Sequence, residues 1–255
     1  MAIMRSRLFL LDLSGGLSDR ILIWGPPDAA KSALAWYFAS GTEKEVIWID
    51  NDLHFESSLY AQGSGFKVYK SITVDDFTDI AYSCKNCVIV VDSLASFAEK
   101  DSAELIIKLE KFVLKYAYDL PLVPKDERNM FIFIDQIRYN ETNSVLNTAV
   151  SRGAIKAFVG QEILTVKLDT DRYRGYVLKN TLGKARFYFN FSLVFENGVL
   201  SGVNDEEDFL VFKDVFKFDG SRDEALDRFR FCLHEFNKLT SQEMLVLQTR
   251  VFNCL

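Results

Sequence analysis

The chain has 255 residues, enough for one large α/β domain with a substantial core. Its 36 acidic residues outnumber its 30 basic ones, so a net charge of −6 excludes a protein coated in positive charge, although a local basic patch could still bind nucleic acid. No apolar run approaches the roughly 18 residues that span a bilayer, and the short "LFLLDL" contains Asp12. We therefore expect a protein without a membrane partner that is cytoplasmic or nucleoid-associated and not secreted.

Four short apolar runs predict β-strands. They are continuous rather than alternating, as in strands buried on both faces of a parallel sheet. These runs are 20–24, 45–50, 87–92 and 130–135. Helices are predicted at 32–39 and at 102–118, where six apolar residues share one face. Those residues are Leu105, Ile106, Leu109, Phe112, Val113 and Tyr116. The alternation of strands and helices predicts an α/β fold with a mainly parallel sheet flanked by helices.

The pattern changes after about residue 162, where strand-like stretches are separated by turn-like breaks. They predict a meander that extends the sheet with antiparallel strands. The stretches are 162–169, 174–181, 185–198 and 210–218. Helices are predicted over 221–255, because Ser221 with Glu224 and Thr240 with Glu243 form capping-box patterns. We expect these helices to pack on a single domain, 1–255, whose core is 12–200.

The cysteines do not form a recognisable metal site. Cys84 and Cys87 form a C-x-x-C pair, but no second pair and no histidine partner completes a zinc site. Cys232 and Cys254 lie far along the chain. We interpret the four as reduced thiols, with Cys87 at the edge of a buried strand.

The stretch "GPPDAAKS" at 25–32 follows a predicted strand and precedes a predicted helix, as a phosphate-binding loop requires. Gly25 opens the pattern G-x-x-x-x-G-K-[ST], and Lys31 and Ser32 close it. Lys31 would reach the β- and γ-phosphates, and the Ser32 hydroxyl would ligate Mg²⁺. Ala30 stands where the second glycine belongs, which is tolerable with helical dihedrals and costly if φ must be positive. The expected nucleotide contacts are Gly25, Pro26, Pro27, Asp28, Ala29, Ala30, Lys31, Ser32 and Ala33.

A second element has the form of a Walker B strand. "CVIVVD" ends in Asp92, a carboxylate at the end of a buried strand that would hold Mg²⁺ through water. Taken alone, Asp92 could equally be a helix N-cap. Because ligands bind at the carboxyl ends of parallel strands, Asp92 and the loop fall on the same edge of the sheet. Together they predict binding of ATP with Mg²⁺.

Several stretches in order resemble the RecA/Rad51 recombinase family, particularly its bacterial and phage branches. "LSGGLSDRILIWGPPDAAKS" resembles that family's lead-in, first core strand and loop, and "VIWIDNDLHFESSLYA" its second core strand. "VIVVDSLASF" resembles its Walker B strand, and "FIFIDQIR" the strand that leads into its second DNA-binding loop. "VSRGAIKAFV" and "YVLKNTLGKARFYFNFSLVFENG" resemble the helix and strands that follow, so the similarity covers about 12–200. The resemblance implies a RecA-like P-loop NTPase fold.

The resemblance also implies roles for single residues near the nucleotide. Asp52 matches the glutamate that orients the attacking water and is one methylene shorter, so we expect slow hydrolysis. Tyr60 would stack on adenine or simply pack in the core. Gln136 would sense the γ-phosphate. Lys179 matches one of two lysines that reach the neighbouring subunit's ATP, and Thr181 replaces the other.

The loop at 139–152 is polar, without helical or strand periodicity, and matches the DNA-binding loop. Arg138, Arg152 and Lys156 would contact phosphates, and Tyr139 would stack on a base. A plain surface loop is the alternative.

The resemblance implies an ATP-dependent protein that binds single-stranded DNA in homologous recombination, strand exchange or DNA repair. It would be a slow DNA-dependent ATPase that forms a homo-oligomer or filament with ATP at the subunit interface. The first alternative is a weakly or non-hydrolysing paralogue that serves another recombinase as a mediator or assembly subunit. The second is an ATPase of the helicase-loader or KaiC type, which the polar loop after "FIFIDQIR" disfavours.

Overall fold

A computed structural model gives the structure of the chain. It describes most of residues 16–205, with gaps, and isolated positions outside that range. The described residues are Leu8, Leu11, 16–56, 59–60, 65–97, 102–138, 147–148, 154–182, 187–205, Leu210, Lys213 and 218–225.

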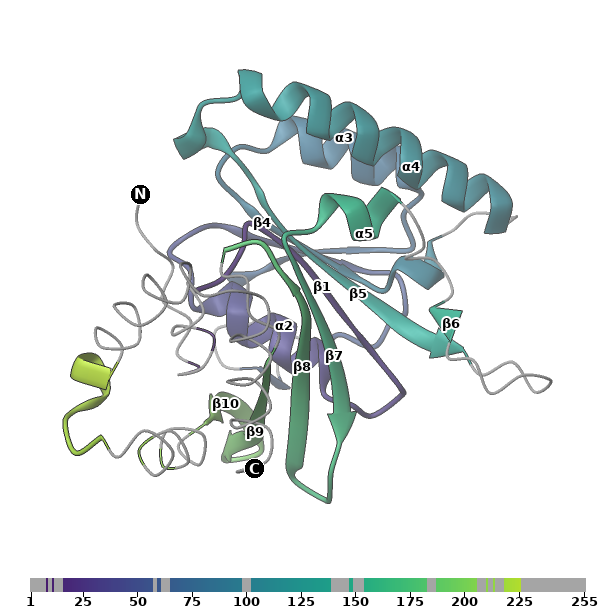
Figure 1. Ribbon diagram of the computed structural model, residues 1–255. Helices are drawn as coiled ribbons and strands as arrows, with labels where there is room; N and C mark the ends of the chain where they lie inside the picture. Colours follow the sequence, from purple (N-terminus) through teal and green to yellow (C-terminus); the bar gives the residue numbers. More distant parts are fainter. Residues whose placement is uncertain are drawn as a thin grey trace.

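One mixed sheet holds the described strands (Figure 1). Its order is β10-β9-β8-β7-β1-β5-β4-β2-β3, and the short β6 pairs with β5. The strands from β7 to β3 run parallel: β7 (Gln161–Lys167), β1 (Arg20–Gly25), β5 (Met130–Arg138), β4 (Val88–Asp92), β2 (Val46–Asp50) and β3 (Lys67–Lys70). The antiparallel strands are β8 (Arg172–Asn180), β9 (Phe187–Glu196), β10 (Val199–Asn204) and β6 (Asn147–Thr148). The predicted parallel sheet with an antiparallel extension is confirmed.

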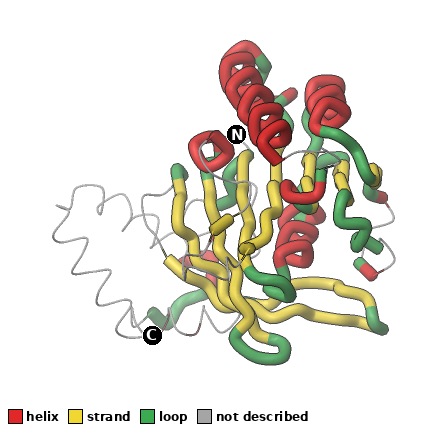
Figure 2. The backbone as a smooth tube through the Cα atoms, turned by 90° about the vertical axis from the view of Figure 1, so that its right-hand side faces the viewer, coloured by secondary structure: helices red, strands yellow, loops and turns green. Residues whose placement is uncertain are grey.

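Helices cover both faces of the sheet (Figures 1 and 2). Helix α2 (Lys31–Ser40) packs on the face that includes Ile21 and Ile23. The other face, which includes Leu22 and Trp24, is covered by α3 (Val74–Ser83), α4 (Ser102–Asp119) and α5 (Ala154–Phe158). The 3₁₀ helices are η3 (Leu94–Ser96), η4 (Leu120–Leu122) and η5 (Lys125–Glu127). Strands β1, β2, β4 and β5 are buried on both faces because these layers enclose them, which explains their continuous apolar sequences.

Two segments differ from the sequence-based predictions. The strand predicted at 210–218 is wrong at its described positions, since Leu210 and Lys213 have helical geometry. The strand that pairs with β9 is instead β10, reached through a tight turn at Asn197 and Gly198 with φ values of 54° and 80°. Two positive φ values in succession are the geometry of a type I′ hairpin turn, which favours Asn-Gly.

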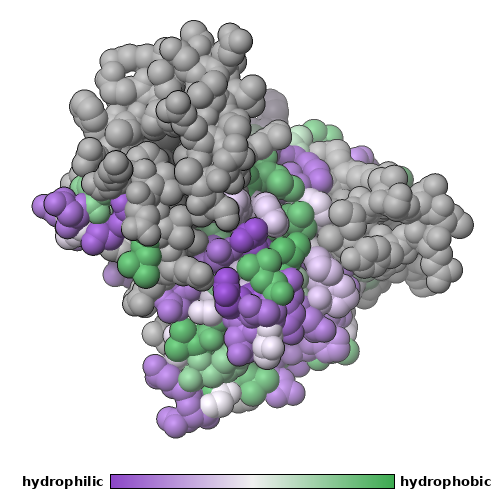
Figure 3. Space-filling model, turned by 60° about the horizontal axis from the view of Figure 1, so that its bottom comes forward, coloured by the Kyte–Doolittle hydropathy of each residue, from purple (hydrophilic) through white to green (hydrophobic). Residues whose placement is uncertain are grey.

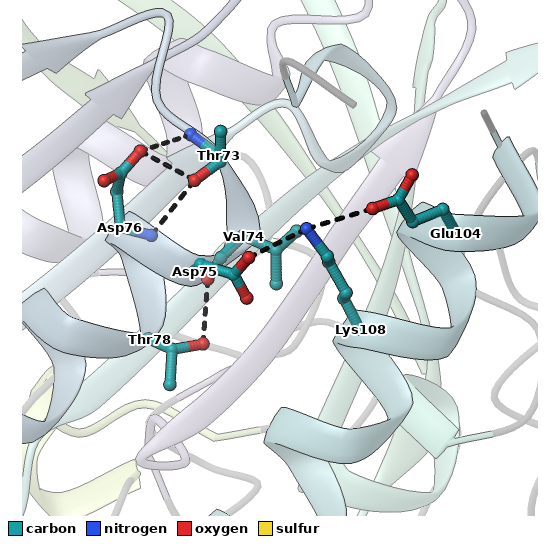
Figure 4. A network of polar contacts seen from close by, with 7 residues as sticks. All are labelled: Thr73, Val74, Asp75, Asp76, Thr78, Glu104 and Lys108. Atoms are coloured by element: carbon teal, nitrogen blue, oxygen red, sulfur yellow. Dashed lines mark hydrogen bonds and ion pairs between the residues drawn. The ribbon is translucent and has the colours of Figure 1, made fainter. Parts of the chain in front are cut away.

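Helix α3 was not predicted, and its first turn carries a complete capping box (Figure 4). The amide of Asp76 donates to Thr73 Oγ1 at 3.2 Å, and the amide of Thr73 donates to Asp76 Oδ2 at 2.9 Å. Lys108 of α4 bonds Asp75 at 2.8 Å and Glu104 at 3.2 Å. These contacts fix the start of α3 and join it to α4. The predicted capping box at Ser221 and Glu224 also forms, with N–H donation in both directions at 2.7 and 3.3 Å.

The surface carries no single hydrophobic band in the view of Figure 3, where hydrophobic and hydrophilic patches alternate over the described residues. Within the described ranges, no helix combines the length and the hydropathy needed to cross a membrane.

Candidate nucleotide site

The carboxyl ends of four parallel strands meet at one edge of the sheet. In the strand register, Gly25 of β1 pairs with Gln136 of β5, and Asp50 of β2 pairs with Asp92 of β4. The predicted loop, carboxylates and γ-phosphate sensor are therefore placed together by the topology. This edge is where open α/β sheets bind ligands.

The loop between β1 and α2 has a left-handed residue immediately before the helix. Ala30 is the N-cap of α2 with φ 56° and ψ 27°, and Asp28 also has a positive φ of 57°. A residue with a Cβ atom costs roughly 1–2 kcal/mol in this conformation. The backbone at Ala30 therefore adopts the left-handed conformation that favours glycine. Of the two possibilities for this alanine, helical dihedrals or a positive φ, the structure has the positive φ, which is the costly one.

Gly25 has a packing role that its place in the motif does not reveal. A Cβ atom on Gly25 would lie 2.3 Å from the carbonyl oxygen of Thr165 in β7. The Cβ position is fixed by the backbone of Gly25, and the oxygen that it would meet belongs to the backbone of Thr165, so no change of side-chain rotamer could relieve the clash. Gly25 is needed for the close approach of β7, and sequence spacing carries no signal for Thr165.

Lys31 is buried in the loop, with 8% of its surface exposed. Its Nζ donates to the carbonyl of Pro26 at 2.6 Å. Burial lowers the pKa of Lys31, and the negative charges of Asp92 and Asp28 oppose that change. A buried ammonium surrounded by carboxylates and loop backbone can bind a phosphate oxygen at this place.

The Ser32 hydroxyl donates to Asp92, which joins the first turn of α2 to the end of β4. Burial raises the pKa of Asp92 to about 7, and the charges of Asp52 and Asp50 add to this effect. Hydroxyl and carboxylate oxygens are the ligands that Mg²⁺ prefers, and a cation would stabilise the ionised carboxylate. The pair therefore fits a magnesium ion that takes its remaining ligands from phosphate and water. Among the described residues, no group of three or more His, Cys, Asp or Glu side chains could hold a metal ion by itself.

The structure joins Asp52 to Gln136. The Gln136 amide Nε2 donates to Asp52 Oδ2 at 3.2 Å, and the Ser96 hydroxyl donates to Asp52 Oδ1. The resemblance implies separate roles for Asp52 and Gln136, and the structure adds a direct hydrogen bond between them. Ser96 was not singled out by the sequence.

Asp50 shapes the turn that carries Asp52. Its carboxylate is 1% exposed and accepts the backbone N–H groups of His54 at 3.0 Å and Phe55 at 3.2 Å. Lys70 of the edge strand β3 lies 3.6 Å away. The carboxylate thus organises backbone instead of pointing into the site. The two acids of "DND", Asp50 and Asp52, are the signal that the sequence offers for this turn.

Tyr60 lies in an aromatic cluster. Its ring stacks on Phe55 with centroids 4.9 Å apart and lies 5.7 Å from Trp36 of α2. Burial raises the pKa of Tyr60 to about 12. These contacts favour the packing interpretation, and stacking on adenine stays a prediction.

Lys179 lies at the edge of the sheet opposite the loop. In register it pairs with Glu162, which itself pairs with Leu22 near the start of β1. Its Nζ donates to the carbonyl oxygens of Lys156 at 2.6 Å and Ala157 at 3.3 Å, in the last turn of α5. Burial lowers the pKa of Lys179. Within one chain, Lys179 is therefore placed away from the loop between β1 and α2.

Lys156, predicted to contact DNA, is engaged inside its own domain. Its Nζ lies 2.9 Å from Glu162 and 4.9 Å from the centroid of the Trp24 ring. Arg138 closes β5, and its backbone pairs with Asn147 of β6. The other predicted DNA contacts, Tyr139 and Arg152, lie outside the described residues. Contact of all four with DNA stays a prediction.

Cys84 and Cys87 are free thiols. Cys87 is buried immediately before β4, and burial raises its pKa to about 11. A thiol that ionises so poorly is a weak nucleophile at neutral pH.

No protein-family model matches the chain, and no curated protein matches it. Among solved structures, it is similar to one described as "The Structure Of A DnaB-Like Replicative Helicase And Its Interactions With Primase", with a TM-score of 0.57 and 11% sequence identity. The match covers 79% of this chain and 63% of that chain, so this chain spans less than two thirds of its neighbour's length. At this identity the likeness establishes the fold alone. The likeness confirms the predicted RecA-like α/β fold and does not distinguish recombinases from helicases.

Proposed function

We propose that this chain binds ATP with Mg²⁺ at the carboxyl edge of its sheet and uses the nucleotide to control binding of single-stranded DNA, in the manner of a RecA-like recombinase. The observation that carries the proposal is the gathering of Lys31, Ser32 and Asp92 where β1, α2 and β4 meet. A basic group, a hydroxyl and a carboxylate in this order form the minimum set for phosphate and magnesium.

Each of these side chains has one task. Lys31 binds the β- and γ-phosphate oxygens with its ammonium, in exchange for its hydrogen bond to Pro26. Ser32 would ligate Mg²⁺, and Asp92 would hold the ion through water. The cation supplies neutralisation of phosphate charge. Asp52 orients the attacking water and accepts its proton.

Gln136 connects this chemistry to the proposed DNA loop. It contacts Asp52 and stands two residues before Arg138, the last residue of β5. A change in its hydrogen bonding on loss of the γ-phosphate would therefore act on the segment 139–152. Hydrolysis serves here as a switch for release, not as chemistry on DNA.

ATP turnover with and without single-stranded DNA tests the proposal. We expect slow hydrolysis that DNA stimulates and that Lys31→Ala abolishes. Lys125→Ala, which removes an exposed lysine in η5, is the matched control and should behave as wild type. DNA affinity should fall with rising salt, and less steeply in the double variant Arg138→Ala, Arg152→Ala. Absent or salt-insensitive DNA binding would contradict the proposal.

A second candidate is a non-hydrolysing paralogue that acts as a mediator for another recombinase. The left-handed backbone at Ala30 favours it, because the strain is located in the nucleotide loop itself. This candidate predicts ATP binding without turnover and a stable complex with another recombinase subunit.

A third candidate is a helicase-type motor, which the DnaB-like structural neighbour supports at the level of fold. It predicts ATP-dependent unwinding of a forked duplex. A recombinase would instead pair homologous strands and leave the fork intact. Assays on a forked duplex and on homologous strands therefore distinguish a helicase-type motor from a recombinase.

A further inference from the structure

The carboxylate of Asp52 is held from two sides. Ser96, the last residue of η3, donates its hydroxyl to Oδ1, and Gln136 of β5 donates its amide to Oδ2 at 3.2 Å. Ser96 lies in the turn that follows β4, and Gln136 lies near the carboxyl end of β5, so both donors are fixed to the same edge of the sheet. Asp52 itself is partly exposed there, as a group that meets water must be.

The hydroxyl of Ser96 is in turn oriented by the 3₁₀ turn. Ser93 Oγ lies 3.1 Å from Ser96 Oγ, and the Ser96 amide donates to the Ser93 carbonyl at 3.2 Å. A serine has one hydroxyl proton. Because Ser96 gives that proton to Asp52, Ser93 must be the donor in the pair of hydroxyls. The result is a directed chain from Ser93 through Ser96 to Asp52.

The backbone of Asp52 is also anchored. The amides of Asn51 and Asp52 both point to the carbonyl of Asp92, at 2.9 and 3.4 Å. With the backbone anchored, only the two side-chain torsions of Asp52 remain free, and the donors at Ser96 and Gln136 select among them.

We propose that Ser96 is a positioning residue for Asp52. Its hydroxyl holds the short carboxylate in the orientation from which the free lone pairs of Asp52 can meet the attacking water. The inference rests on the proposed ATP hydrolysis and adds to it a residue that acts through Asp52 without touching the nucleotide.

Steady-state ATP hydrolysis gives the first test. Ser96→Ala should lower kcat about tenfold with little change in KM, because positioning affects the reacting geometry and not nucleotide binding. Ser96→Thr keeps the hydroxyl and should restore most of the rate. In an Asp52→Ala background, which leaves no carboxylate to position, Ser96→Ala should have no further effect on the residual rate. Ser83→Ala, an exposed serine at the end of α3, is the matched control.

A double-mutant cycle on stability gives a readout that does not depend on turnover. The free energies of unfolding of Ser96→Ala, Asp52→Ala and the double variant should be non-additive if the two side chains are bonded. Additive values would overturn the inference whatever the activity. If the wild type hydrolyses ATP and Ser96→Ala is as active as Ser83→Ala, the positioning role of Ser96 is overturned and the proposed hydrolysis stands. No turnover in the wild type would refute the proposed hydrolysis, and the positioning role with it.

Discussion

At the scale of single residues, Ala30 is the clearest departure from what its backbone requires. Ala30→Gly should raise the free energy of unfolding by about 1 kcal/mol, because glycine removes the strain of the positive φ at a smaller cost in chain entropy. It should also tighten ATP binding. Ala33→Gly, two residues inside the same helix boundary, should instead lower stability by about 1 kcal/mol. Chemical denaturation of both variants makes the comparison, and destabilisation by Ala30→Gly would contradict the strain argument.

Asp92 should give the ligand-free protein a distinct pH dependence. Its pKa is raised from 3.8 to about 7 in the folded chain, so the folded state binds the proton more tightly than the unfolded state does. The associated stability is present below about pH 4 and is lost as the pH rises towards 7. The free energy of unfolding of Asp92→Asn, compared with that of wild type, should therefore be more favourable at pH 8 than at pH 4.5. Thermal unfolding across this range measures it, with Asp126→Asn on the exposed η5 as the control.

The sequence predicted the place of the loop between β1 and α2, because the motif has a fixed order between a strand and a helix, and nucleotide binding by its residues stays a prediction. It could not predict the φ of Ala30, since two conformations were compatible with alanine. Nor could it reveal Thr165 and Ser96, whose importance depends on the close approach of β7 to Gly25 and of η3 to Asp52. Residues far apart in sequence carry no spacing signal for such contacts.

At the scale of elements, the first turn of α3 offers a clean stability test. Thr73→Ala removes one half of the capping box and should cost about 1 kcal/mol. Thr78 lies in the same helix, and its hydroxyl returns to the carbonyl of Val74, so Thr78→Ala should have a much smaller effect. Equal losses for the two variants, measured by denaturant unfolding, would show that the cap contributes nothing special.

The sequence predicted well those elements whose burial produces either a continuous run of apolar residues or apolar residues at helical spacing. Strand β3 was missed because its residues, "KVYK", lie at the exposed edge and form no apolar run. Helix α3 was missed although Thr73 and Asp76 match a capping pattern, with aspartate in the place of the more usual glutamate. The stretch at 210–218 is predicted as a strand because its apolar residues are dense, yet Val211, Phe212, Val215 and Phe216 also fit a helical repeat in the sequence.

At the scale of the whole molecule, the placement of Lys179 makes a prediction about assembly. If Lys179 serves the ATP of a neighbouring chain, mixing Lys31→Ala chains with Lys179→Met chains should recover turnover that neither variant shows alone. About a quarter of the interfaces in an equal mixture would pair an intact loop with an intact Lys179. Turnover that never exceeds the sum of the separate variants would mean that Lys179 only caps α5.

The opposite placement of Gly25 and Lys179 has a consequence for symmetry. A contact that brings the amino edge of one sheet to the carboxyl edge of the next uses two different surfaces, so after two chains pair, one chain keeps its carboxyl edge free and the other keeps its amino edge free. Such a head-to-tail contact cannot be satisfied about a two-fold axis. Chains joined through it would stack in one direction, and only the rotation between successive copies would decide whether they close on themselves or continue without limit.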